Sequence, residues 1–200
     1  MVKELAETLD QLGIDYAIVG GIAATSWGNV RTTLGIDVVM NIKDEDVPVL
    51  AGALRKRDFS LTENDIMMAL KEKSHFTTHD EKSLLRIDAK GAYGPRELET
   101  LRTKKKILIG KTEIYLASPE DMIANKLFSG SEQDTRDAEG IYARQFQHID
   151  VNGLRSTARK LGVSAQLSKM DKRMRKRINN LSSWRRTRQE AKQSPSPRVK

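Results

Sequence analysis

The chain has 200 residues, of which 38% are hydrophobic and 31% charged, so it can form one domain of ordinary size with part of its length outside the packed core. The absence of cysteine excludes disulfides, thiolate zinc sites and cysteine nucleophiles, and it suits a reducing cytoplasm. No apolar run approaches the roughly 18 residues of a membrane helix, and the N-terminal segment lacks the order of a signal peptide. We therefore expect a cytoplasmic protein with no membrane partner.

The net charge of +8 is distributed unevenly along the chain. Residues 151–200 hold 15 Lys or Arg against Asp171 and Glu190, a balance of +13, whereas residues 1–150 hold 20 basic and 25 acidic residues. A segment with this field attracts polyanions, and nucleic acid is the leading candidate. The alternative is a solvated basic tail that keeps the protein soluble.

The first half of the chain alternates between helical and strand-like patterns. A leucine stripe with spacings of four and three predicts a first helix that ends at Gly13. Asp44 is placed to cap a helix, and Phe59 with Leu61 suggests a short strand. The predicted strands are residues 16–19 and 36–40, and the predicted helices are residues 1–12, 22–27, 47–54 and 66–70.

The second half to residue 150 predicts two β-hairpins and three helices. Alternating polar and apolar residues indicate the hairpins. Ser118 followed by Pro119 and two carboxylates is a strong helix start, with Ser118 as its cap. The hairpins pair residues 75–79 with 84–88 and 106–109 with 112–116, and the helices cover residues 95–101, 118–127 and 133–146.

After Asp150 the composition changes. From Leu167 to Leu181, apolar side chains recur every three or four residues among Lys and Arg, which predicts one amphipathic basic helix, either continuous or broken near Asn179-Asn180. Its apolar stripe would pack on the core or on a second copy of the chain, or the helix would contact nucleic acid. We expect a domain over residues 1–150, a basic helical extension over 151–190 and a disordered tail over 191–200.

Three features could carry chemistry. Gly20-Gly21 lies between a predicted strand and helix, where it would let a phosphate approach a helix N-terminus or would simply form a tight turn. Asp37 lies within an apolar strand, where a carboxylate needs a cation or faces solvent. Asp88 ends another predicted strand. One sheet could bring both carboxylates together around divalent metal ions that hold a triphosphate.

In order and spacing, these residues resemble the small nucleotidyltransferases of the DNA polymerase beta superfamily. The stretch from Tyr16 to Ala23, then Arg31-Thr-Thr33 and Ile36-Asp37, is most similar to the AbiEii-type branch, which includes toxins of toxin–antitoxin systems. The helix from Ser118 to Leu127, which contains Lys126, and the later Asp134 and Asp137 extend the resemblance over about residues 1–150. It implies an α+β nucleotidyltransferase fold with a mixed central β-sheet flanked by helices.

The resemblance also implies a role for each matched residue. Gly20 and Gly21 would cradle the triphosphate of an NTP, while Asp37 and Asp88 would be catalytic and bind Mg²⁺ or Mn²⁺. Lys126 would reach the nucleotide phosphates, unless it is an ordinary surface lysine. Arg31 and Thr33 would order their loop or contact the phosphates.

Two positions depart from the family pattern. Gly35 stands where the first aspartate of an Asp-x-Asp pair is expected, and Ser131 where an arginine is common. Glycine offers no oxygen, so two-metal phosphoryl transfer should be weakened. Asp44 and Asp46 lie too far along the chain to replace it, whereas Glu63 or Asp65 would have to approach from a loop.

The leading hypothesis is therefore a Mg²⁺-dependent enzyme that moves an NMP from an NTP to a hydroxyl of RNA, such as tRNA, or of a protein. The alternative is a catalytically impaired nucleotide- or nucleic-acid-binding module. An antitoxin or a second copy of the chain would be the protein partner.

Overall fold

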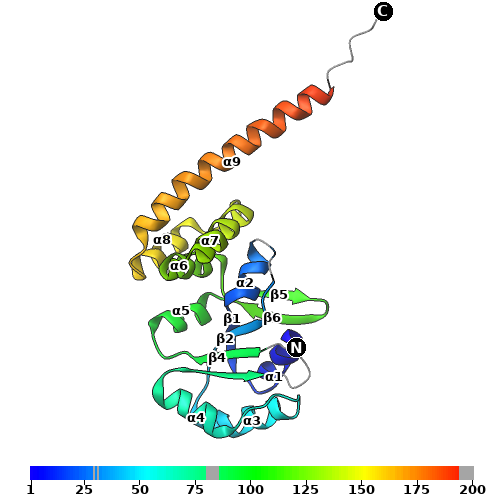
Figure 1. Ribbon diagram of the computed structural model, residues 1–200, viewed down its shortest axis with the longest axis vertical. Helices are drawn as coiled ribbons and strands as arrows, with labels where there is room; N and C mark the ends of the chain where they lie inside the picture. Colours follow the sequence, from blue (N-terminus) through cyan, green and yellow to red (C-terminus); the bar gives the residue numbers. More distant parts are fainter. Residues whose placement is uncertain (29, 31, 80–85, 194–200) are drawn as a thin grey trace, which may run out of the picture.

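The computed structural model describes residues 1–28, 30, 32–79 and 86–193, with the backbone alone for residues 181–193. Figure 1 shows a central sheet with α3 and α4 at one end, a group formed by α6, α7 and α8 at the other, and α9 extending away from the body. Within these residues no helix is both long and apolar enough to cross a membrane.

The described residues form one six-stranded mixed sheet in the order β3-β4-β2-β1-β6-β5. β2 runs parallel to β4, and β1 runs parallel to β6, while the remaining neighbours are antiparallel. The strands are β1 (Asp15–Ile18), β2 (Gly35–Asn41), β3 (His75–His79), β4 (Arg86–Gly91), β5 (Lys105–Ile109) and β6 (Thr112–Leu116).

Helices cover both faces of this sheet. On one face α5 packs on β1 and β2, where Leu101 contacts Ala17 and Val39. The other face carries the larger core, to which Leu5, Leu50 and Ile66 contribute. The helices of this part are α1 (Val2–Gln11), α2 (Gly20–Trp27), the 3-10 helix η1 (Asp44–Asp46), α3 (Val47–Arg55), α4 (Glu63–Glu72) and α5 (Pro95–Thr103).

The C-terminal helices belong to the same hydrophobic core. They are α6 (Pro119–Ser129), α7 (Glu132–Gln145), α8 (Val151–Lys160) and α9 (Ser164–Gln193). Leu154 of α8 and Leu167, Met170 and Met174 of α9 are buried in that core, and Ile178 packs against it. The apolar stripe of α9 thus lies on the body of the protein as far as Ile178.

The α+β class, the mixed sheet and the order of elements predicted from the sequence are confirmed. Ser118 caps α6 as predicted, because its hydroxyl accepts a hydrogen bond from the Asp121 amide at 3.1 Å. Of the two possibilities for the basic helix, α9 runs unbroken through Asn179-Asn180 to Gln193. Three details were wrong. Asp44 caps no helix, since η1 precedes α3. Phe59 forms a single bridge, not a strand.

The third concerns β4, which continues to Gly91, so that Asp88 is its third residue rather than its last. Leu84 and Arg31, and the predicted tail from residue 194, lie outside the described residues.

Candidate active site

The parallel pairing of β2 with β4 places the two predicted catalytic carboxylates side by side. Asp37 is the register partner of Asp88, and Gly35 is the partner of Arg86 two residues earlier on each strand. Because side chains alternate along a strand, all four positions share one sheet face. Asp37 and Asp88 are both half-buried.

The turn after β1 brings the glycine pair against Asp37. The Val19 amide donates to the Asp37 carbonyl at 2.8 Å, and the Gly21 amide points to Asp37 Oδ2 at 3.4 Å. Gly20 has φ +58°, and a Cβ there would lie 1.9 Å from Asp37 Oδ2. Only glycine satisfies both the left-handed backbone and the close approach.

Gly20 is also the first residue of α2, so the helix begins beside the Asp37 carboxylate. The indole Nε1 of Trp27 donates to the Ala117 carbonyl at 2.8 Å, and Gln145 Nε2 donates to the Trp27 carbonyl at 3.1 Å. These bonds hold the far end of α2 against the turn between β6 and α6 and against α7. The amides of the first turn of α2, of which that of Gly21 points to Asp37 Oδ2, therefore have a fixed direction.

Asp88 is bound by its neighbours through both carboxylate oxygens. Thr77 Oγ1, its register partner on β3, donates to Oδ1 at 2.7 Å. Arg86 Nε donates to Oδ2 at 2.8 Å and forms an ion pair with it. A Cβ at Gly35 would lie 3.4 Å from Asp88 Oδ2 and 3.5 Å from Arg86 Nε.

Lys126 is not an ordinary surface lysine. Its side chain is 15% exposed, and its Nζ lies 2.6 Å from Asp134 Oδ1 and 3.1 Å from Asp137 Oδ2. Burial raises the pKa of Asp134, but hydrogen bonds from Lys126 and Ser131 outweigh burial and hold that pKa below its ordinary value. α6 and α7 are thus joined by a largely desolvated ion-pair cluster.

A pocket of about 240 Å³ extends from Gly20 along this sheet face, between the sheet and α5 and α6. Val39 and Lys90 line it, two residues beyond Asp37 and Asp88 on their strands. Its lining also includes Arg96, Glu97, Thr100, Asp121, Asn125 and Lys126. Lys90 pairs with Glu97 at 2.6 Å, and Lys126 pairs with Asp134 and Asp137, so Arg96 is the lining cation that an anionic ligand would meet directly.

Asp121 is the buried carboxylate of this pocket. Thr100 Oγ1 donates to its Oδ2 at 2.7 Å. Burial raises the pKa of Asp121, and the hydrogen bond from Thr100 opposes that shift only in part. The wall of the pocket between α5 and α6 therefore carries a carboxyl group whose charged form is disfavoured.

The remaining predicted residues are placed as follows. Thr33 Oγ1 donates to the Gly35 carbonyl at 3.2 Å, which orders the approach to β2. Asp65 forms a capping box with Thr62, and Glu63 pairs with Arg55, so neither replaces a carboxylate at position 35. Across the described ranges, no three His, Asp or Glu side chains gather in an arrangement that could hold a metal ion.

The serine at position 131, where an arginine was expected, has a structural role at the start of α7. Its hydroxyl accepts from the Asp134 amide at 3.0 Å and donates to Asp134 Oδ2 at 2.6 Å, so it caps α7 and orients the partner of Lys126. Sequence reasoning missed Arg86, Lys90 and Arg96. The two-residue spacing from Asp88 to its neighbours on the strand was the signal for Arg86 and Lys90, whereas Arg96 had none.

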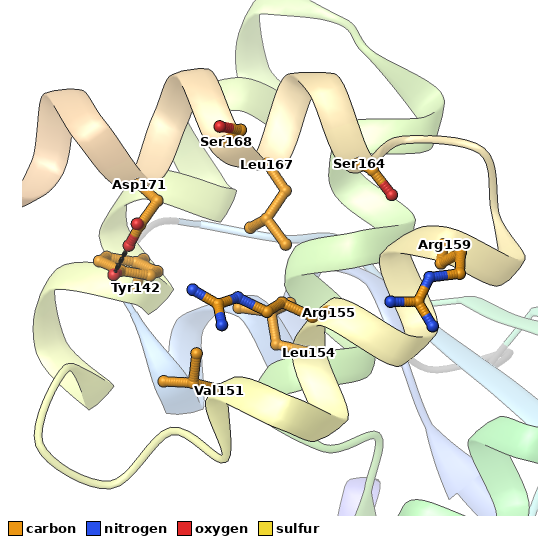
Figure 2. Close-up of a pocket in the computed structure, with 9 residues that line it drawn as sticks. All are labelled: Tyr142, Val151, Leu154, Arg155, Arg159, Ser164, Leu167, Ser168 and Asp171. Carbon is orange, nitrogen blue, oxygen red and sulfur yellow. Dashed lines mark hydrogen bonds between the residues drawn. The ribbon is translucent and has the colours of Figure 1, made fainter.

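A second pocket, of about 260 Å³, lies between α8 and the first turns of α9. Figure 2 shows Arg155 and Arg159 directed into the opening, with Ser164 and Ser168 on the facing helix. Neither arginine has an ion-pair partner within the described part of the chain. At one end, burial and the neighbouring Asp171, which accepts a hydrogen bond from the Tyr142 hydroxyl, raise the pKa of Tyr142 to about 12.

Comparison with known proteins identifies the fold. No family model matches the chain, and no curated protein sequence matches it. An antigenic nucleotidyltransferase-like protein from Paracoccidioides brasiliensis is similar in structure, with TM-score 0.54 and 21% identity over 84% of this chain and 89% of that one. ANT(2″)-Ia in complex with adenylyl-2″-tobramycin has TM-score 0.52 and 11% identity over 80% and 92%. The chain therefore has a nucleotidyltransferase fold.

Proposed function

We propose that this protein is a nucleotidyltransferase that moves an NMP from an NTP to a hydroxyl acceptor. The observation that carries the proposal is the parallel register that sets Asp37 beside Asp88, with the Gly20 turn and the start of α2 against Asp37. The acceptor oxygen would bond to the α-phosphorus while the bond to the bridging oxygen breaks. Pyrophosphate would leave, and Asp88 would take the hydroxyl proton.

Each remaining residue has a role in holding the nucleotide. Gly20 and Gly21 would offer the first amides of α2 to the triphosphate. Lys126 and Lys90 line the pocket, where each would exchange part of its carboxylate pairing for the phosphates. Thr33 would keep its loop ordered. Arg31, which lies outside the described residues, stays a prediction as a phosphate contact.

The donor set fits one divalent cation and not two. Mg²⁺ is commonly held by one or two carboxylates together with substrate phosphates, and Asp37 and Asp88 meet that requirement. Mg²⁺ or Mn²⁺ bound there would neutralise charge on the triphosphate. A second ion would need the carboxylate that Gly35 lacks.

The test is transfer of label from each α-³²P NTP to total RNA or to cell protein, with Mg²⁺ or Mn²⁺. We expect label on one class of acceptor and its loss, by at least about a hundredfold, in Asp37→Ala. Transfer that persists undiminished in Asp37→Ala would contradict the proposal.

Gly35 favours a second candidate function, in which the protein binds a nucleotide but does not transfer an NMP. In that case the protein would bind a fluorescent ATP analogue, Lys126→Met would weaken binding, and no acceptor would be labelled by the unmodified protein. Labelling that depends on Asp37 would exclude this function.

We propose that the acceptor is RNA, and the positive charge of the C-terminal part of the chain supports this proposal. Residues 151–200 carry 15 basic residues, and Arg155 and Arg159 face a pocket without an ion-pair partner in the described structure. For a single strand, each phosphate that a protein cation neutralises adds about 0.7 to the slope of log affinity against log salt. Arg155→Gln with Arg159→Gln should therefore reduce the slope, whereas Arg136→Gln, at a residue that pairs with Glu132, should not.

If the double variant binds RNA with an unchanged salt slope, these arginines do not contact the RNA. In the transfer assay, label found on protein alone would mean that the acceptor is a protein and not RNA. The toxin–antitoxin association belongs to the AbiEii-type resemblance. Co-expression with a neighbouring gene product that suppresses growth arrest would test it.

A further inference from the structure

Gly35, which stands where a metal-binding carboxylate is expected, faces a cation. Its register partner is Arg86, and the Arg86 guanidinium lies beside the space where a side chain at position 35 would begin. A Cβ there would be in ordinary contact with Arg86 Nε and with Asp88 Oδ2, the two atoms that already form an ion pair at 2.8 Å. One cation therefore already occupies the gap between position 35 and Asp88.

We propose that Arg86 supplies, as a fixed positive charge, what a second divalent ion would supply in a site with three carboxylates. Replacing one carboxylate and one divalent ion with a glycine and a guanidinium leaves the formal charge of the site unchanged. Arg86 is a positioning residue, because it acts through Asp88. This inference rests on the proposed function, because the charge matters for NMP transfer, but its test measures Mn²⁺ binding and needs no transfer.

The geometry explains why glycine and arginine belong together. A carboxylate at position 35 would start 3.5 Å from Arg86 Nε and would pair with it. Introducing an aspartate alone would therefore not build a second metal site, because the guanidinium would compete with the ion for both carboxylates. Only removal of the Arg86 charge as well would leave three free carboxylates on this sheet face.

The test is Mn²⁺ binding to the full chain, followed through the electron paramagnetic resonance signal of free Mn²⁺, without nucleotide. Arg86→Gln should raise Mn²⁺ affinity about tenfold, because it removes a unit charge that lies 2.8 Å from Asp88 Oδ2, a carboxylate oxygen that would bind the ion. Arg86→Lys should behave as the unmodified protein. Arg102→Gln is the matched control, because Arg102 Nε lies 2.8 Å from Glu99 Oε2 in an equally local pair, and it should change nothing.

Position 35 gives the second arm. Gly35→Asp alone should leave Mn²⁺ affinity within about threefold of the unmodified protein, while Gly35→Asp with Arg86→Gln should bind two ions in place of one. The inference is overturned if Gly35→Asp alone binds a second ion, or if Arg86→Gln and Arg102→Gln are indistinguishable. Arg86 is 57% exposed, so its substitution should not prevent folding.

Failure of the proposed function would look different. If no variant labels any acceptor but the Mn²⁺ affinities follow the expected order, transfer is excluded and the role of Arg86 stands. If the unmodified protein transfers label but Mn²⁺ affinity ignores Arg86, the proposed function stands and this inference falls.

Discussion

Gly20 and Gly13 both have a left-handed backbone, with φ +58° and +66°, but they differ in what a side chain would meet. Nothing lies within 4 Å of a Cβ at Gly13, whereas a Cβ at Gly20 would collide with the Asp37 carboxylate. Gly13→Ala should therefore cost only the backbone strain, about 1–2 kcal/mol. Gly20→Ala should also displace Asp37 and weaken binding of a fluorescent ATP analogue by at least about tenfold.

Urea unfolding and nucleotide titration of the two variants separate strain from site geometry. Equal nucleotide affinity in both would show that the close approach of Gly20 to Asp37 does not shape the binding site.

The ion-pair cluster of Lys126 gives a second prediction at this scale. Asp137 is 3% exposed, so Lys126→Met would remove an ammonium from a buried carboxylate and should cost about 3 kcal/mol. Lys106→Met removes a cation from a pair in which both side chains are about half exposed, and it should cost much less. Urea unfolding measures both; similar costs would mean that the Lys126 cluster is effectively solvated.

Individual side chains also mark where sequence reasoning stopped. Asp37, Asp88 and Lys126 could be singled out because an aspartate in an apolar strand, or a lysine in a recognised helix, stands out from its neighbours. Arg86 had only its two-residue spacing from Asp88 to mark it, because its importance comes from facing Gly35 across two strands that are separated by some fifty residues. A pairing between distant strands is invisible to local periodicity.

At the scale of elements, periodicity predicted the strands and most helices, because apolar spacing and caps are local signals. It misplaced Asp44, where a 3-10 turn intervenes before α3, and it could not decide whether α9 continues through two asparagines that the helix tolerates. It also could not give the strand order, in which β4 lies between β3 and the distant β2.

The link between α5 and α8 has a pH dependence that can be measured. Hydrogen bonds from Arg102 and Lys160 lower the pKa of Glu99 from 4.5 to about 2. The Glu99 carboxylate therefore binds a proton more tightly in the unfolded chain than in the folded protein. The stability that the ionised carboxylate contributes is complete above pH 4.5 and is lost as the pH falls toward 2.

Glu99→Gln should accordingly lower the unfolding free energy by about 0.5–1 kcal/mol at pH 7, and the difference should shrink as the pH falls below 4.5. Urea unfolding between pH 3 and pH 7 checks it. Glu132→Gln, from an exposed pair within α7, serves as the control and should show a smaller effect. A Glu99→Gln difference that stays constant over this range would contradict the assigned pKa.

For the whole molecule, charge asymmetry suggested a basic extension attached to an acidic domain, but the packing links the two more closely. Arg173 and Arg177 of α9 both pair with Glu139 of α7, and the buried side chains of α8 and α9 are part of the one core. Composition alone cannot distinguish a basic helix that packs from one that is solvated, because both carry Lys and Arg on the outer face.

Two truncations with different end points test whether the first half of α9 is part of the folded body. Deleting residues 164–200 would remove Leu167, Met170 and Met174 from the core, each worth about 1.5–3 kcal/mol when buried. That sum approaches the total stability of a typical domain, about 5–15 kcal/mol, so the protein truncated in this way should unfold or aggregate.

Deleting residues 181–200 leaves those side chains in place and should keep the unfolding free energy within about 1 kcal/mol while lowering RNA affinity and its salt slope. Circular dichroism with urea unfolding and RNA titration measures both effects. A stable protein after deletion from residue 164 would make the first half of α9 an appendage, whereas an unchanged salt slope after deletion from residue 181 would confine RNA binding to the helices that pack on the body.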